Sequence, residues 1–149
     1  MIASTLIIGI SVVLFLYWFR YTCVLILNTR TSKDYTQEVA QANQLQFPAV
    51  EGALGQYVPP NFNTLHEALE RDYRIVNYLL DHTAHLEVQG VSIEQYVLRA
   101  DYAVMRLWFR AASRISHSAT RNSLREMSQI VSHLANSFGE RLAHESQAS

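Results

Sequence analysis

The sequence predicts an all-α protein in which a single N-terminal transmembrane helix precedes a small antiparallel three-helix bundle. Residues 1–27 contain one charged side chain, Arg20, although the whole chain of 149 residues holds 12 Lys and Arg and 13 Asp and Glu. Three later segments carry apolar residues at the three- and four-residue spacing of amphipathic helices. We expect a transmembrane anchor over 1–28, a juxtamembrane helix and Pro/Gly linker over 29–63, and a helical bundle domain over 64–146.

The anchor is predicted from an uncharged apolar run over residues 2–19. As an α-helix this run covers about 27 Å, close to the hydrocarbon thickness of a bilayer. No Lys or Arg precedes it, and bulky residues follow it where a signal peptidase would need small ones. We therefore expect the segment to be retained as a membrane anchor.

Positive charges follow the anchor, at Arg20, Arg30 and Lys33, and none precedes it. The positive-inside rule then predicts an outside N-terminus and a cytoplasmic C-terminal domain. Aromatic residues around Trp18 suit the headgroup boundary, where Arg20 can extend its charge into water. A second register spans 6–27, buries Arg20 and requires a partner subunit. Trp18 and Arg20 are therefore candidate contacts to lipid or to a partner.

Two segments connect the anchor to the bundle. Ser32 is a candidate cap for a short helix over 33–42, which is expected to be a surface helix or a stalk. Residues 47–63 are predicted to be a linker because they hold all three prolines, namely Pro48, Pro59 and Pro60.

The first bundle helix is predicted over about 65–86, with Thr64 and Glu67 as a capping box at its start and Gly90 beyond its end. Asp72 falls within the apolar stripe of this helix. A buried carboxylate needs a hydrogen-bonding partner or a raised pKa. We expect a buried ion pair or hydrogen bond from another helix that fixes the packing. The alternatives are a general acid or base in a pocket, or a rotation of the stripe that leaves Asp72 at its edge.

The second helix is predicted over about 92–116, with Ser92 and Gln95 as its capping box. Its expected buried row is apolar at helical spacing and consists of Ile93, Val97, Ala100, Val104, Leu107, Ala111 and Ile115. The apolar row fails between 116 and 123, which predicts a break with Ser118 or Thr120 as a cap. The third helix, about 120–144, is expected to bury Leu124, Met127, Ile130, Val131, Leu134, Phe138 and Leu142.

Four arginines recur on one flank of the second helix at spacings of seven, four and four, and they are Arg99, Arg106, Arg110 and Arg114. On a tethered domain such a row could contact an acidic partner subunit or anionic lipid headgroups. The alternative is pairing with acidic residues of the first helix or simple solvation.

Motifs for catalysis or cofactor binding are missing from the sequence. His82 and His85 are three residues apart but have no further ligands, and no His-Glu-x-x-His, Gly-rich phosphate loop or nucleophile elbow occurs. Cys23 is the only cysteine, so an intramolecular disulfide and a multi-cysteine zinc site are excluded. We expect no catalytic residue, no metal and no cofactor, and the net charge of -1 argues against nucleic acid.

The sequence thus favours a non-enzymatic accessory, assembly or scaffold subunit that acts through protein–protein contacts at a membrane. Its expected partners are other subunits of a membrane complex or further copies of the same chain. One alternative is a sensor of anionic membrane surfaces that uses the arginine row. Another is a small helical enzyme built on Asp72 and a histidine.

Overall fold

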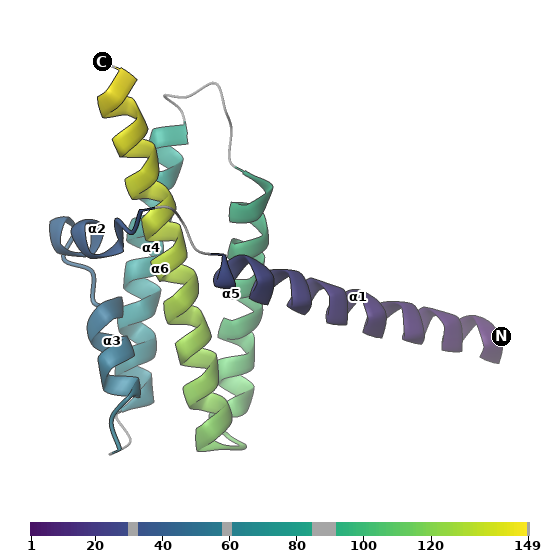
Figure 1. Ribbon diagram of the computed structural model, residues 1–149. Coiled ribbons are helices and arrows are strands. Elements are labelled where there is room, and N and C mark those ends of the chain that lie inside the picture. The colour runs from purple at the N-terminus through teal and green to yellow at the C-terminus, as the bar shows by residue number, and fades with distance from the viewer. Residues whose placement is uncertain (30–32, 58–60, 85–91, 149) are drawn as a thin grey trace. The chain divides into compact units, whose positions relative to one another are not determined.

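The computed structural model describes residues 1–29, 33–57, 61–84 and 92–148, and within these ranges it contains six helices and no strand (Figure 1). The all-α prediction is confirmed for this part of the chain. The chain divides into two compact units, Met1–Arg30 and Thr31–Ser149.

The first unit contains helix α1 (Ile2–Asn28), which has 27 residues and is therefore about 40 Å long. It is the one described helix that is both long and apolar enough to cross a membrane. Its aromatic residues contact each other along the helix: Phe15 stacks on Phe19, and Trp18 meets Tyr21 edge to face at 5.9 Å between ring centroids.

The second unit is built around helix α6 (His117–Ala148). Helices α2 (Thr36–Ala42), α3 (Phe47–Leu54), α4 (Phe62–Ala84) and α5 (Ile93–Ala112) all pack on it. In Figure 1, α5 runs opposite to α4 and α6. The described parts of α4 and α5 have no Cα atoms within 8 Å of each other. Helix α6 is therefore the element that the other four helices of this unit share, whereas α4 and α5 meet through their side chains.

The core side of α6 confirms most of the predicted row for the third bundle helix. Five of its side chains have no exposed surface: Leu124, Met127, Ile130, Val131 and Leu134. Phe138 is almost buried, whereas Leu142 is 43% exposed and lies outside the core.

Helix α3 lies where the sequence predicted a linker, so that prediction is wrong over Phe47–Leu54. Phe47, Val50 and Leu54 are buried, and they follow a three- to four-residue spacing. Pro48 lies in the first turn, where a helix needs no N–H donor, and so it is compatible with the helix. The prediction for Pro59 and Pro60 lies outside the described residues.

Helix α2 was expected to be a surface helix or a stalk over 33–42, but it starts at Thr36 and buries Val39 and Ala40. It ends in a tight turn in which Gln44 has a φ of 52° and Leu45 donates its N–H to the Ala40 carbonyl at 2.9 Å. This left-handed turn leads the chain from α2 into α3. The predicted cap Ser32 lies outside the described residues.

The start of α4 differs from the prediction because Asn61 caps it. The Asn61 side chain accepts a hydrogen bond from the Asn63 N–H at 3.1 Å, so Thr64 lies inside the helix and the predicted capping box with Glu67 is wrong. The predicted end near residue 86 and Gly90 lie outside the described residues. At α5, the predicted cap is confirmed, since Ser92 accepts the Gln95 N–H at 3.4 Å.

The buried row predicted for α5 is wrong, because the helix turns the opposite face toward the core. Leu98, Tyr102, Met105 and Phe109 are buried together with Gln95, Asp101 and Ala112. Most of the predicted row is exposed instead: Ile93, Ala100, Val104, Leu107, Ala111 and Ile115. The true buried face escaped prediction because it contains two polar groups and a tyrosine.

The break between α5 and α6 lies at 113–116, earlier than predicted. Ser118 and Thr120 are inside α6 and are not its caps. The Thr120 hydroxyl instead donates to the Ser116 carbonyl at 2.8 Å. Helix α6 also continues to Ala148, beyond its predicted end near residue 144.

Candidate interaction surfaces

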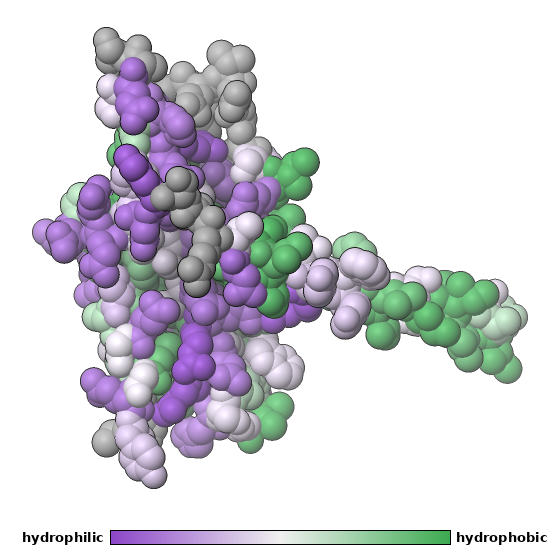
Figure 2. Space-filling model, in the orientation of Figure 1, coloured by the Kyte–Doolittle hydropathy of each residue, from purple (hydrophilic) through white to green (hydrophobic). Residues whose placement is uncertain are grey.

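The exposed side of α5 carries five of the large apolar side chains that are exposed in the described part of the second unit. We call it the α5 outer face and define it by its exposed residues Ile93, Tyr96, Ala100, Ala103, Val104, Leu107, Trp108 and Ala111. Leu107 and Tyr96 are each 61% exposed and Trp108 is 49% exposed. Figure 2 shows apolar surface gathered on this side of the second unit, beside predominantly polar surface. Contiguous exposed apolar surface of this kind typically marks a site of interaction.

The predicted arginine row separates into two pairs. Arg99 contacts Asp81 of α4 at 2.6 Å between Nη2 and Oδ1, and Arg106 lies 3.7 Å from Glu70 of α4. These ion pairs bridge α4 and α5 where their backbones are far apart. Both are partly exposed, so each stabilises the packing by at most about 1 kcal/mol.

Arg110 and Arg114 are exposed at one edge of the α5 outer face. Neither forms an ion pair with a residue in the described part of the chain. The α5 outer face itself contains no acidic residue, and the only exposed acid of α5, Glu94, lies 3.4 Å from His133 of α6. This edge is therefore positively charged.

A polar cluster that the sequence did not predict lies between α4 and α5. The ring of His66 stacks on Phe109 at 4.3 Å between centroids, and Tyr73 stacks on Tyr102 at 3.7 Å. Glu70 lies 3.9 Å from His66 and is also the partner of Arg106. These large side chains fill the space between the two separated backbones, so they explain how α4 and α5 enclose a core without direct backbone contact.

Burial dominates the ionisation of this cluster. It raises the pKa of Tyr102, and Glu70 adds to that shift because a second negative charge nearby would be unfavourable. Burial also lowers the pKa of His66, although Glu70 opposes this effect. At neutral pH both groups therefore remain uncharged. No sequence pattern indicated the cluster, because its members lie on two helices and follow no motif.

Asp72 is buried on α4, and one of its oxygens accepts two backbone hydrogen bonds. Oδ2 receives the N–H of Gln46 at 2.5 Å and that of Phe47 at 2.6 Å. The carboxylate therefore caps the N-terminus of α3 from a neighbouring helix. Burial raises the pKa of Asp72, while the two backbone N–H groups act against this rise.

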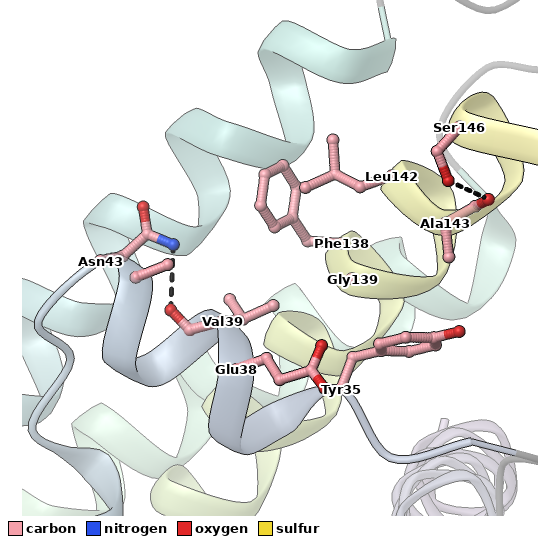
Figure 3. A pocket seen from close by; sticks show the side chains of 10 residues that line it. Tyr35, Glu38, Val39, Asn43, Phe138, Gly139, Leu142, Ala143 and Ser146 are labelled. Atoms are coloured by element: carbon pink, nitrogen blue, oxygen red, sulfur yellow. Dashed lines mark hydrogen bonds between the residues drawn. The ribbon is translucent and has the colours of Figure 1, made fainter. Parts of the chain in front are cut away.

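A groove of about 320 Å³ lies between α2 and the C-terminal half of α6 (Figure 3). Val39, Phe138 and Leu142 supply its apolar part, and the side chain of Tyr35 borders it. Its two helices are held together by Asn136, whose Oδ1 accepts the Tyr35 N–H at 2.7 Å. Gly139 permits this contact, because a Cβ there would collide with Tyr35 and lie 3.1 Å from Val39.

Trp18 and Arg20, the predicted contacts in the anchor, lie within α1, and Trp18 is 62% exposed. They belong to the first unit, whereas the α5 outer face, Asp72 and the α2–α6 groove belong to the second. Within the described residues, no group of three or more His, Cys, Asp or Glu side chains could hold a metal ion.

Comparison of the chain with protein-family models, with curated proteins and with solved structures found no match. The arrangement of its own residues is therefore the basis for a functional proposal.

Proposed function

We propose that this chain is a single-pass membrane protein that serves as a non-enzymatic accessory, assembly or scaffold subunit. In this proposal α1 anchors it in the bilayer and the α5 outer face binds another protein. The observation that carries the proposal is the exposure of Tyr96, Leu107 and Trp108 on one helix face. Aromatic and large aliphatic residues of this kind commonly anchor protein interfaces.

The packing of the second unit supports this assignment. Its core is complete without the α5 outer face, since Tyr102 and Leu98 on the opposite side of α5 are at most 1% exposed. The outer face is therefore not needed to close the core. Large apolar side chains gathered on one exposed helix face are typical of a site of interaction, whereas scattered single ones are not.

The membrane part of the proposal places the N-terminus outside and the second unit in the cytoplasm. It is supported by the length and apolar character of α1 and by the positive charges at Arg20 and Lys33 near its C-terminal end. Trp18 would lie at the boundary of the bilayer on the cytoplasmic side.

The proposal is tested by co-purification of the full-length chain from its native membranes in a mild detergent. Leu107→Ser removes a central apolar side chain of the outer face, and Tyr78→Ser removes a similarly exposed side chain of α4 as the matched control. We expect Leu107→Ser to lower the recovery of co-purifying proteins at least tenfold and Tyr78→Ser to leave this recovery unchanged. Equal recovery with both variants would contradict the proposal.

The exposed pair Arg110 and Arg114 favours a second candidate, in which the same edge lies against anionic lipid headgroups. Each arginine near such a surface contributes about 1 kcal/mol. In that case the bound lipid takes the place of a protein partner, so Leu107→Ser leaves the co-purifying proteins unchanged. The enzyme alternative remains a prediction. Asp72 of α4 accepts two backbone N–H groups at the start of α3, which favours a structural role for this carboxylate.

A further inference from the structure

Large and small side chains follow each other along the α5 outer face in an order that makes this face complementary to a second copy of itself. Seven of its residues lie within an arc of about 100° at 3.6 residues per turn. In chain order they are Ile93, Tyr96, Ala100, Ala103, Val104, Leu107 and Ala111, and all seven are exposed. Between Tyr96 and Ala111, large and small residues exchange places when this order is reversed.

An antiparallel copy would therefore place Tyr96 and Leu107 opposite alanines. With the two-fold axis between Ala103 and Val104, Tyr96 faces Ala111 and Ala100 faces Leu107, while Ala103 meets the Ala103 of the other copy beside the axis. Ile93 lies beyond these pairs, at the end of the paired stretch. A parallel copy in register would instead place alanine on alanine and leucine on leucine, which leaves gaps and collisions along the same helix. Alternation of large and small residues across facing positions is what dense helix packing requires.

From this pattern we propose that the chain forms a homodimer through antiparallel pairing of two α5 outer faces. The proposal rests on the proposed function and names its partner as a second copy of the same chain. The interface is isologous, because each residue pair occurs twice around the two-fold axis.

The exposed arginines are compatible with this arrangement. In the antiparallel pair, the two copies of Arg110 lie about 20 Å apart along the helix axis, beyond the roughly 8 Å screening length at physiological salt. The outer face between them contains no charge, so pairing does not bury an unpaired ion.

The area of the interface explains why the anchor matters for the dimer. Helix α5 has 20 residues and is about 30 Å long, so each copy would bury on the order of 400–500 Å². This is less than the roughly 800 Å² per partner of a typical stable interface. Two anchored copies share one membrane, however, and confinement raises their effective concentration.

The test uses the full-length chain reconstituted alone in lipid vesicles, with Cys23→Ala to remove the native thiol. Single cysteines are introduced by Ala103→Cys, Tyr96→Cys or Ala111→Cys, and by Tyr78→Cys as an exposed control on α4. We expect Ala103→Cys to form a disulfide-linked dimer by itself. Tyr96→Cys and Ala111→Cys should crosslink only when the two variants are mixed, and Tyr78→Cys should not crosslink above the collision background.

The possible outcomes separate this inference from the proposed function. Self-crosslinking of both Tyr96→Cys and Ala111→Cys would indicate a parallel pair and overturn the antiparallel dimer, and the absence of all crosslinks would overturn any dimer through this face. In either case, loss of co-purifying proteins with Leu107→Ser would leave the proposed function standing.

A size exchange provides a second and independent measurement. Ala100→Leu places leucine opposite leucine and should lower Ala103→Cys crosslinking severalfold. Combining it with Leu107→Ala restores a large residue opposite a small one at both sites and should recover the crosslink. Failure of the double variant to recover it would contradict the proposed pairing.

Discussion

Asp72 joins two segments of the second unit, because its buried carboxylate receives the first N–H groups of α3. The sequence predicted a carboxylate within an apolar stripe, and the structure indeed buries this side chain. Its partners were expected on another bundle helix, but they are the backbone N–H groups of Gln46 and Phe47. Backbone donors are present at nearly every residue, so no sequence pattern identifies which ones a buried carboxylate will bind.

Replacing this side chain should destabilise the second unit without affecting the anchor. Asp72→Ala removes both hydrogen bonds to the start of α3, and the expected cost is about 1–3 kcal/mol of the free energy of unfolding. Asp72→Asn keeps one acceptor oxygen and should cost less. Thermal unfolding in detergent measures both changes, and Asp81→Asn on the exposed side of α4 serves as the control with a cost below about 1 kcal/mol.

The pH dependence of this effect has a defined sign. Because burial raises the pKa of Asp72 in the folded state, the folded chain binds this proton more tightly than the unfolded chain. The corresponding stability is present below the ordinary pKa of 3.8 and is lost as the pH rises through the higher folded value. The advantage of the wild type over Asp72→Asn should therefore shrink as the pH rises from about 4. If the stability advantage of the wild type grew with pH, this pH prediction would be wrong. If Asp72→Asn kept full stability but lost an activity, the enzyme alternative would be favoured instead.

The orientation of α5 shows what the sequence can predict about an element and what it cannot. Its existence, its Ser92 cap and its approximate length were predictable from local patterns. Its rotation was not, because the helix has two faces with apolar residues. The more apolar face was expected to be buried, but the core is filled by the face with Tyr102 and Phe109, whose rings stack on α4. Packing against the side chains of α4 and α6 determines which face of α5 turns toward the core. The residue pattern of α5 alone contains no information about these neighbours.

Helix α3 was missed for a related reason. Its eight residues contain Pro48 and Gly52, and these residues predict a loop when they are read locally. The helix is stabilised by burial of Phe47, Val50 and Leu54 and by the carboxylate of Asp72, which comes from 25 residues further along the chain. Such support from distant residues cannot be recognised in the segment itself.

The contact between α2 and α6 should depend on the lack of a side chain at Gly139. Gly139→Ala adds a Cβ that collides with Tyr35, although alanine is favoured over glycine in a helix by about 1 kcal/mol. We expect the collision to dominate, so that α2 is displaced, the Tyr35 hydrogen bond to Asn136 is lost and the segment around α2 becomes sensitive to protease. Limited proteolysis and thermal unfolding measure the two effects.

Two matched variants separate the collision from the helix preference. Gly52→Ala lies within α3, where an added Cβ meets nothing within 4 Å, and it should stabilise the chain slightly. Tyr35→Gly removes the atom with which the new Cβ collides, so Gly139→Ala should no longer be unfavourable in that background. Equal effects of Gly139→Ala in both backgrounds would rule out the collision as the cause.

At the scale of the whole molecule, the division into an apolar helix and a helical unit was predictable from composition. The uncharged run over residues 2–19 and the concentration of charge after it were sufficient. Helix α3 and the burial of α2 were not predicted, since both helices are short and depend on α6 for their burial. The α5 outer face was likewise hidden, because the sequence assigned its residues to the core.

The proposed topology predicts which parts of the molecule a membrane-impermeant reagent can reach. In a Cys23→Ala background, Tyr57→Cys places a thiol at a fully exposed position of the second unit, and Ala3→Cys places one near the start of α1. A maleimide that cannot cross the membrane should label the cysteine at position 3 in intact cells, and the one at position 57 only after permeabilisation. The opposite labelling pattern would reverse the proposed orientation.

The central place of α6 has a consequence for the order of events during biosynthesis. This helix follows α2, α3, α4 and α5 in the chain, and all four depend on it for their core contacts. Its hydrogen bonds to earlier segments span 101 residues at Tyr35 and 81 at Phe47. While the ribosome is still making α6, the preceding helices have only their contacts with each other and lack the core side of α6, although α1 has already been synthesised. Folding of the second unit therefore has to wait until α6 emerges, and a nascent chain stalled before residue 117 would present its apolar surfaces to chaperones.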